Sequence, residues 1–333
     1  MKIVIFLLSS ILLFACSEPK VNHVTSLPQT THQLSVDSIN SKILLNPRDV
    51  IATSDYLIIA NSLKDTIFDV FDIKTLDYLY SDVCFGGAPN EMLNFRNVEY
   101  LNENSLYAVG LGVPMWTKIN VADKMIVENH KIEDVENGII QNMYLLNNKV
   151  LFKCDKEIEW KLYDMANKNL VDLPNSPFWG HEPQGNKIEL FKYRAVNVAV
   201  KNDFSKFAFF NSYLPYVRMF DSEGSLIHDT FVEKTPDDYY NLLLDKKHYY
   251  SRCCATDEYI FVRCYLNDSK DLRTTIQVWD WNANLLSLIE LDNKLGAFTI
   301  SPDGNHLYGV KIDSDYIYYC DLSGLNNSLQ TFN

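Results

Sequence analysis

Residues 299–321 read TISPDGNHLYGVKIDSDYIYYCD, and this stretch contains the unit from which most of the chain is built. One apolar run ends at the polar turn SPDG, a second run (306–311) follows that turn, and a third run ends at Asp321. The runs are rich in β-branched and aromatic residues, whereas the turn consists of Ser, Pro, Asp and Gly. The stretch therefore predicts successive antiparallel strands joined by tight turns.

The same pattern occurs six times along the chain. Runs that resemble HLYGVK and follow a polar turn are YLIIAN (56–61), SLYAVG (105–110), KVLFKC (149–154), KFAFFN (206–211) and YIFVRCY (259–265). The next run in each unit ends in an apolar residue followed by Asp72, Asn120, Asp164, Asp221, Asp280 or Asp321. An Asp or Asn side chain can bond its own backbone two residues on, so each is expected to open a turn into a fourth strand.

The intervals between these six positions run from 41 to 59 residues. A period of this length with four strands in each unit is typical of a β-propeller blade. The alternative is a pair of β-sandwiches, which would need two unrelated patterns instead of one recurring pattern. We therefore predict an all-β, six-bladed β-propeller of four-stranded antiparallel blades over residues 36–333. The ring would be closed either by QLSVD (33–37) or by SLQTF (328–332).

The chain begins MKIVIFLLSSILLFACSEPK, which predicts an exported protein. Lys2 precedes an apolar run (3–14) that has the length of a signal-peptide core and is too short for a membrane-spanning helix. The tetrad that ends in Cys16 resembles a bacterial lipobox, which implies cleavage after residue 15, acylation of Cys16 and lipid anchoring. The alternative is an ordinary signal peptide with a coincidental cysteine. Residues 16–35 are polar and are expected to form the lipidated cysteine and a flexible tether.

Composition restricts the partners. The 333-residue chain has a formal net charge of −13 and no cluster of lysine and arginine, so we expect no nucleic-acid partner. None of the seven cysteines forms a C-x-x-C pair, and buried free thiols are favoured over disulfides for the six beyond Cys16. The adjacent Cys253 and Cys254 should point to opposite faces of a strand. No cofactor is predicted, and we expect a monomeric propeller.

The segment FGGAPNEMLNF (85–95) contains two glycines, a proline and a glutamate between two strand-like runs. A phosphate-binding loop would open onto a helix, and neither a helix pattern nor a Lys-Ser/Thr pair follows. We therefore interpret it as the structural connection from the outer strand of the first blade to the inner strand of the second. Gly86 and Gly87 would permit positive φ, Pro89 would fix its own φ, and Glu91 would accept backbone N–H bonds.

Two long connections are the candidate binding sites. PNSPFWGHEPQGNK (174–187) carries Trp179, His181 and Glu182, an aromatic and hydrogen-bonding set suited to a sugar or a peptide. VEKTPDDYYNLLLDKKHYYSRCC (232–254) offers Tyr239 and Tyr240 as stacking surfaces. The alternative for both segments is a packed surface loop with no role in binding.

No catalytic motif emerges from the sequence. The seven histidines form no H-E-x-x-H motif, and no G-x-S-x-G elbow is present. Asp313-Ser314-Asp315 lacks the Gly and the distal Glu of a calcium loop and is interpreted as a hairpin tip, so no metal site is predicted.

Two short stretches resemble known propeller repeats. Residues 299–321 resemble the TolB repeat through the SPDG hairpin and the terminal Asp, and residues 85–110 resemble a degenerate NHL-type repeat. The lead-in of the latter departs from the usual Gly-Pro-Gly at Ala88-Pro89-Asn90-Glu91. Together with the lipobox, the chain is similar over its whole length to the TolB-like six-bladed propeller lipoproteins of Bacteroidetes. That family has no settled activity, so the resemblance implies no catalytic residues.

The leading hypothesis is a non-enzymatic binding propeller in the cell envelope that recognises a protein, peptide or glycan. The sorting rule for lipoproteins implies the outer membrane, because Ser17 and not Asp follows the cysteine, while a periplasmic or surface location stays open. One alternative is a glycan-active hydrolase or lyase with its site in the central funnel. Another is an architectural subunit of an envelope complex, which should expose a large apolar patch.

Overall fold

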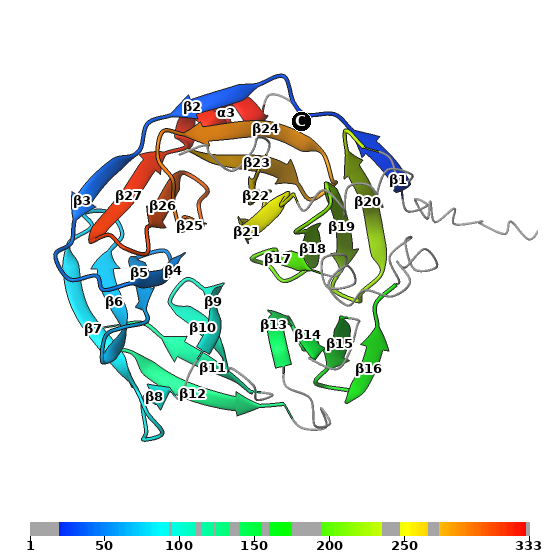
Figure 1. Ribbon diagram of the computed structural model, residues 1–333. Coiled ribbons are helices and arrows are strands. Elements are labelled where there is room, and N and C mark those ends of the chain that lie inside the picture. Colours follow the sequence, from blue (N-terminus) through cyan, green and yellow to red (C-terminus); the bar gives the residue numbers. More distant parts are fainter. Residues whose placement is uncertain are drawn as a thin grey trace, which may run out of the picture.

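The computed structural model describes residues 20–92, 95–110, 115–122, 124–132, 140–154, 160–174, 195–234, 247–265 and 273–330. These residues form six β-sheets of four or five strands, which stand as blades around a common centre (Figure 1). The predicted all-β, six-bladed propeller is confirmed.

Each blade begins with an inner strand and continues outward with antiparallel neighbours. Blade one contains β4 (Pro47–Ala52), β5 (Tyr56–Asn61), β6 (Thr66–Asp72), β7 (Tyr78–Phe85) and β8 (Glu91–Met92). Blade two contains β9 (Phe95–Asn102), β10 (Ser105–Gly110), β11 (Met115–Asn120) and β12 (Ile126–Lys131). Blade three contains β13 (Ile140–Leu146), β14 (Lys149–Cys154), β15 (Lys161–Asp164) and β16 (Asn169–Asp172).

The second half of the ring draws three further strands from the N-terminal part of the chain. Blade four contains β17 (Val196–Val200), β18 (Lys206–Asn211), β19 (Tyr216–Asp221), β20 (Leu226–Val232) and β1 (Lys20–Thr25). Blade five contains β21 (Tyr250–Ala255), β22 (Tyr259–Cys264), β23 (Thr274–Asp280), β24 (Leu285–Leu291) and β2 (Thr31–Leu34). Blade six contains β25 (Ala297–Ile300), β26 (His306–Val310), β27 (Tyr316–Asp321) and β3 (Asp37–Asn40).

The hydrophobic core is divided among the spaces between neighbouring blades. Phe68 of blade one packs in the same cluster as Val98 of blade two, and Phe298 of blade six packs in the same cluster as Phe261 of blade five. Four more clusters occupy the remaining blade interfaces. A strand in the middle of a blade is therefore covered on both faces, which explains why a run such as YLIIAN (56–61) is continuously apolar and lacks a period of two.

The Asp that ends the third strand opens a turn, as predicted. Asp72 Oδ1 accepts hydrogen bonds from the backbone N–H groups of Lys74 and Thr75, both at 2.9 Å. Asp164, Asp221, Asp280 and Asp321 also accept backbone N–H bonds from residues two to four positions on. These bonds favour the carboxylate, so they hold the pKa of Asp72 below its ordinary value. The recurring Asp is thus a structural part of five blades, although Asp321 leads into a helix (Ser323–Gln330) and not into the expected fourth strand. In blade two the equivalent Asn120 instead accepts a hydrogen bond from Ser105 Oγ and donates one to Glu128 Oε1.

The N-terminal strap, which we define as residues 20–40, runs around the outside of blades four, five and six (Figure 1). Strand β1 pairs in parallel with β20, and β2 pairs in parallel with β24. The expected flexible tether over residues 16–35 is therefore wrong for these two segments, because their backbones satisfy open sheet edges. Residues 16–19 of the expected tether, and the signal peptide over residues 1–15, lie outside the described residues.

The ring is closed by β3, which pairs antiparallel with β27 of the last blade. The closing strand begins at Asp37, the last residue of the stretch QLSVD that the sequence offered as one possibility. The other possibility, a strand over 328–332, is not what forms: residues Ser323–Gln330 make the helix α3. Leu325 and Leu329 of α3 pack into the interface between blades five and six. In the described part of the chain, no helix is long and apolar enough to cross a membrane.

The segment after β7 connects blade one to blade two, and it contributes β8, which pairs in parallel with β7. Glu91 Oε2 accepts a hydrogen bond from Ala88 N at 2.8 Å, and Ala88 O accepts one from Glu91 N at 3.1 Å. The expected positive φ does not occur at Gly86 or Gly87; among described glycines it occurs at Gly224 and Gly304. The carboxylate of Glu91 packs directly against Gly86, so a Cβ there would make this carboxylate shift.

Five cysteines, Cys84, Cys253, Cys254, Cys264 and Cys320, are free thiols. Cys253 packs against the interface between blades four and five, whereas Cys254 packs against the interface between blades five and six. The prediction that these two side chains point to opposite faces of their strand is confirmed.

Candidate functional site

A cavity of about 320 Å³ lies among the inner strands. Its walls come from β4, β9, β13, β17, β21 and β25, which border the centre of the ring in Figure 1. The cavity reaches the turns after β17 and β25, where Asn202 and Pro302 line it. Its size is at the lower end of the range for small-molecule sites.

Each inner strand contributes a polar side chain to the lining of this cavity. They are Asp49 from β4, Asn97 and Glu99 from β9, Asn142 and Tyr144 from β13, Asn197 from β17, Arg252 from β21 and Thr299 from β25. Residues two apart in a strand share a face, so Asn97 and Glu99 point the same way. Val98, between them, is 3% exposed and packs against blade one. The inner strands thus combine apolar blade interfaces with a polar central lining.

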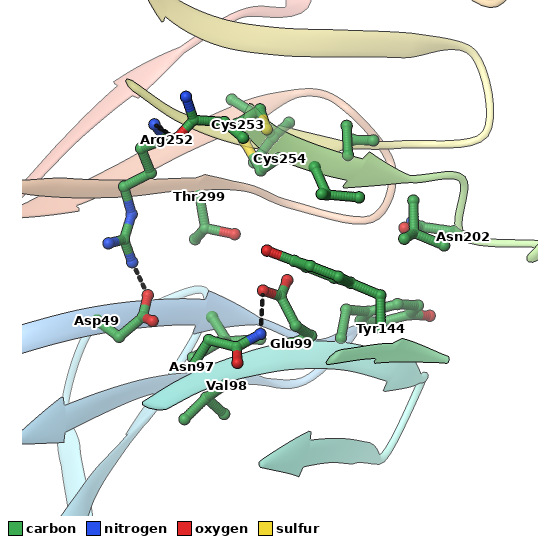
Figure 2. A pocket seen from close by; sticks show the side chains of 18 of the residues that line it. Asp49, Asn97, Val98, Glu99, Tyr144, Asn202, Arg252, Cys253, Cys254 and Thr299 are labelled. Atoms are coloured by element: carbon green, nitrogen blue, oxygen red, sulfur yellow. Dashed lines mark hydrogen bonds and ion pairs between the residues drawn. The ribbon is translucent and has the colours of Figure 1, made fainter. Parts of the chain in front are cut away.

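Glu99 is an acid of the cavity whose pKa is strongly raised. Asn97 Nδ2 donates a hydrogen bond to Glu99 Oε1 at 2.9 Å, and Tyr144 lies beside this carboxyl group (Figure 2). Burial raises the pKa of Glu99 to about 7, and the bond from Asn97 opposes only part of that effect. The side chain can therefore exchange a proton near neutral pH.

Asp49 and Arg252 form an ion pair across the cavity, from β4 to β21 (Figure 2). Their side chains are 15% and 27% exposed, and burial lowers the pKa of the Arg252 guanidinium to about 10. Arg252 has a φ of 44° at an irregularity in the pairing of β21 with β22, and its backbone N–H donates to Asn197 Oδ1 at 3.1 Å. A non-glycine residue in this left-handed conformation is uncommon and often marks a functional position.

The remaining lining groups combine donors and acceptors. Arg96 Nε donates to Asn142 Oδ1 at 2.6 Å, which joins blades two and three beside the cavity. Lys201 is paired with Asp203 at 2.5 Å. Asn97 Oδ1 is a buried acceptor with no hydrogen-bond partner among the described residues. A buried acceptor of this kind normally has a partner, so a hydroxyl or a water is expected to complete it.

Among the candidate residues that the sequence singled out, those that the structure describes do not line this cavity. Trp179, His181, Glu182, Tyr239 and Tyr240 lie outside the described residues, as does Cys16, so their roles stay predictions. Gly86, Gly87, Pro89 and Glu91 belong to the connection between the outer strand β7 and the inner strand β9 and do not line the cavity. Within the described residues, no group of three or more His, Cys, Asp and Glu is arranged to hold a metal ion.

Sequence reasoning missed Asp49, Glu99, Tyr144 and Arg252 because they are scattered over blades one, two, three and five. One signal was available. The inner strand RNVEY (96–100) alternates charged or amide residues with apolar ones, unlike the continuously apolar second strands. Polar residues two apart on the first strand of a blade would have indicated the central lining.

Comparison with known proteins supports the fold. No protein-family model and no curated protein matches this chain. Among solved structures, the chain is similar to a member of the DUF4221 family from Bacteroides vulgatus, with 10% identity and a TM-score of 0.53 over 86% of this chain and 98% of that one. It is also similar to Raptor from Chaetomium thermophilum, with 13% identity and a TM-score of 0.50.

The match to Raptor covers 85% of this chain and spans 28% of the Raptor chain. At identities this low, both similarities show the β-propeller fold alone. The comparison does not extend to the rest of the Raptor chain.

Proposed function

We propose that this protein is a lipid-anchored envelope propeller of the Bacteroidetes TolB-like type, which binds a small polar ligand, or a polar group of a larger partner, in its central cavity. The anchor would be acylated Cys16, with Ser17 directing the protein to the outer membrane. The lipobox-like sequence supports the anchor. The partner would be a glycan, a peptide or an envelope protein.

One observation carries the binding proposal: all six inner strands place polar side chains around one cavity. Burying polar and charged groups costs free energy unless they are paired. Apolar side chains could fill the centre of the ring without this desolvation cost, as they fill the interfaces between neighbouring blades. The buried acceptor of Asn97 and the half-buried Glu99 are the features that a ligand would satisfy.

The test is to solubilise the full-length protein from its own envelope and to identify the bound molecules by mass spectrometry. Wild type should be compared with Tyr144→Ala, which removes a lining side chain, and with Tyr316→Ala, an exposed tyrosine on β27. We expect a small polar molecule or a glycan that is retained by wild type and Tyr316→Ala and lost from Tyr144→Ala. Identical bound molecules in all three preparations would refute the central cavity as the binding site.

A glycan-active enzyme is the second candidate, and one observation favours it. The cavity contains two carboxyl groups, Asp49 and Glu99, and the raised pKa of Glu99 suits a general acid at neutral pH. Against this role, Asp49 is neutralised by Arg252. Turnover of the co-purifying glycan by wild type, abolished in Glu99→Gln, would establish the enzyme; binding without turnover would leave the non-enzymatic function.

A further inference from the structure

This inference rests on the central binding site proposed above. The charges that line the cavity restrict the chemical class of ligand that can bind there. Arg252 is paired with Asp49, and Lys201 is paired with Asp203. The cations that line the cavity beyond Lys201 are then Arg96 and Arg252, and the lining carboxyl groups are Asp49 and Glu99. The charges cancel when Glu99 is ionised, and a single positive charge remains when it is protonated. Among the described lining residues, a strongly charged ligand would therefore find no unpaired cluster of opposite charge, so the site is suited to a neutral molecule.

The hydrogen-bonding groups restrict the ligand further. Amides, hydroxyls and a carboxyl group lie close together around the space, and several are able both to donate and to accept. Figure 2 shows Tyr144, Glu99 and Asn97 on one side and Thr299 and Arg252 on the other. A ligand with hydroxyl groups on several sides matches this arrangement, because each hydroxyl is both a donor and an acceptor. An apolar ligand would leave the buried Asn97 Oδ1 without a partner.

The size of the space is the third restriction. A volume of about 320 Å³ equals that of roughly ten waters in the liquid. One six-membered sugar ring with bridging waters fits such a space, whereas a folded peptide segment does not. The aromatic ring of Tyr144 supplies an apolar face of the kind that can pack against the C–H face of a sugar ring.

We propose that the cavity binds one neutral saccharide ring, held between Asn97, Glu99 and Tyr144 on one side and Thr299 and Arg252 on the other. The ring would be a free sugar or the terminal unit of a longer glycan. The hydroxyl groups of the sugar would donate to Asn97 Oδ1 and to Glu99, and they would accept from Arg252 and Tyr144.

The test uses saturation-transfer NMR with the full-length protein and a fixed set of sugars. The neutral probes are glucose, galactose, mannose and N-acetylglucosamine, and the charged probes are glucuronate, glucosamine and glucose 6-phosphate. We expect signal from at least one neutral sugar, weaker or absent signal from its charged analogues, and a Kd raised about tenfold, or ~1.4 kcal/mol, by Asn97→Ala and by Tyr144→Phe. The matched controls Asn129→Ala and Tyr316→Phe lie on β12 and β27, away from the cavity, and should leave the Kd unchanged.

Three outcomes would overturn the inference: binding of charged sugars only, no binding of any neutral probe, or neutral binding that Asn97→Ala and Tyr144→Phe do not weaken. Thermal unfolding of each variant separates loss of a contact from loss of the fold. The envelope experiment described above distinguishes the two proposals. A charged or peptidic molecule that is lost from Tyr144→Ala would retain the central binding site and reject the neutral saccharide.

Discussion

Replacing Glu99 with Gln should remove a pH dependence from the stability of the folded protein. The pKa of Glu99 is raised from 4.5 to about 7, because burial disfavours the carboxylate. Between these two pH values the folded state keeps a proton that the unfolded state releases. The free energy of unfolding of the wild type therefore falls as the pH rises through this interval and is level above it. A glutamine side chain cannot ionise, so the Glu99→Gln variant lacks this contribution.

The magnitude follows from the same interval. Each unit of difference in pKa is worth about 1.4 kcal/mol, which gives at most about 3.5 kcal/mol between pH 4.5 and about 7. Water entering the cavity screens the carboxyl group, so we expect about 1–2 kcal/mol to be measured.

The assay is urea unfolding of both proteins at a series of pH values across this interval. The quantity to follow is the wild-type free energy of unfolding minus that of Glu99→Gln, which cancels the titration of all other groups. This difference should become less positive by about 1–2 kcal/mol from the acidic to the neutral end. Glu128→Gln, on the exposed outer strand of the same blade, is the control for replacing a glutamate with glutamine outside the cavity. A pH-independent difference for Glu99→Gln would refute the account of a buried, protonated carboxyl group.

Three further predictions concern the anchor, the ring closure and the packing of a glycine. Cys16→Ala should move the protein from the membrane fraction to the soluble fraction, and unchanged partitioning on fractionation would reject the lipid anchor. Deleting residues 1–40 removes β3 and its pairing with four positions on β27, so the free energy of unfolding should fall by about 4 kcal/mol relative to a protein lacking residues 1–36, which keeps β3 but not β2; equal urea midpoints would show that β3 does not close the ring. Gly309→Ala places a Cβ 3.1 Å from the backbone oxygen of Ala297 and 2.5 Å from Leu295 Cδ1, and it should destabilise the protein by about 1–3 kcal/mol. The matched Gly324→Ala on α3 meets no atom within 4 Å and should leave stability the same or raise it by up to about 1 kcal/mol, so equal melting temperatures for the two variants would contradict the packing argument.

The fold was predictable because its determinants are local and repeated. The Asp that ends the third strand in five of the blades bonds backbone groups within four residues, so its effect is visible in any one of those repeats. The apolar second strands are long enough to be recognised singly, as in KFAFFN (206–211). Six weak occurrences of one local pattern then identify an architecture that no single occurrence would.

The strap was not predictable by the same reasoning. Strands β1 and β2 lie at the outer edges of blades, and the side chains of β2 are alternately half-buried and exposed. These strands pair with β20 and β24 through backbone hydrogen bonds. Backbone pairing depends little on which side chains are present, so the sequence does not reveal it. A polar stretch such as THQLS (31–35) therefore has the composition of a linker although part of it forms a strand.

The binding site was less predictable still, for a geometric reason. Asp49 and Arg252 form one ion pair although about 200 positions separate them in the chain. The polar lining exists only because six inner strands converge on one axis, and each strand contributes one or two residues. Spacing within the sequence therefore does not show which polar residues from different inner strands meet.

The order of the strap along the ring also determines how the molecule would respond to mechanical force. A pull on the chain before Lys20 loads the pairing of β1 with β20 first, and that of β2 with β24 next. Only after both have separated does tension reach β3 and β27, whose separation opens the ring. Strands β1 and β2 would thus detach one after the other before force reaches the strand pair that closes the ring. If the protein is tethered through its N-terminus, detachment of β1 and β2 would lengthen the connection to the membrane while the six blades and the central cavity stay intact.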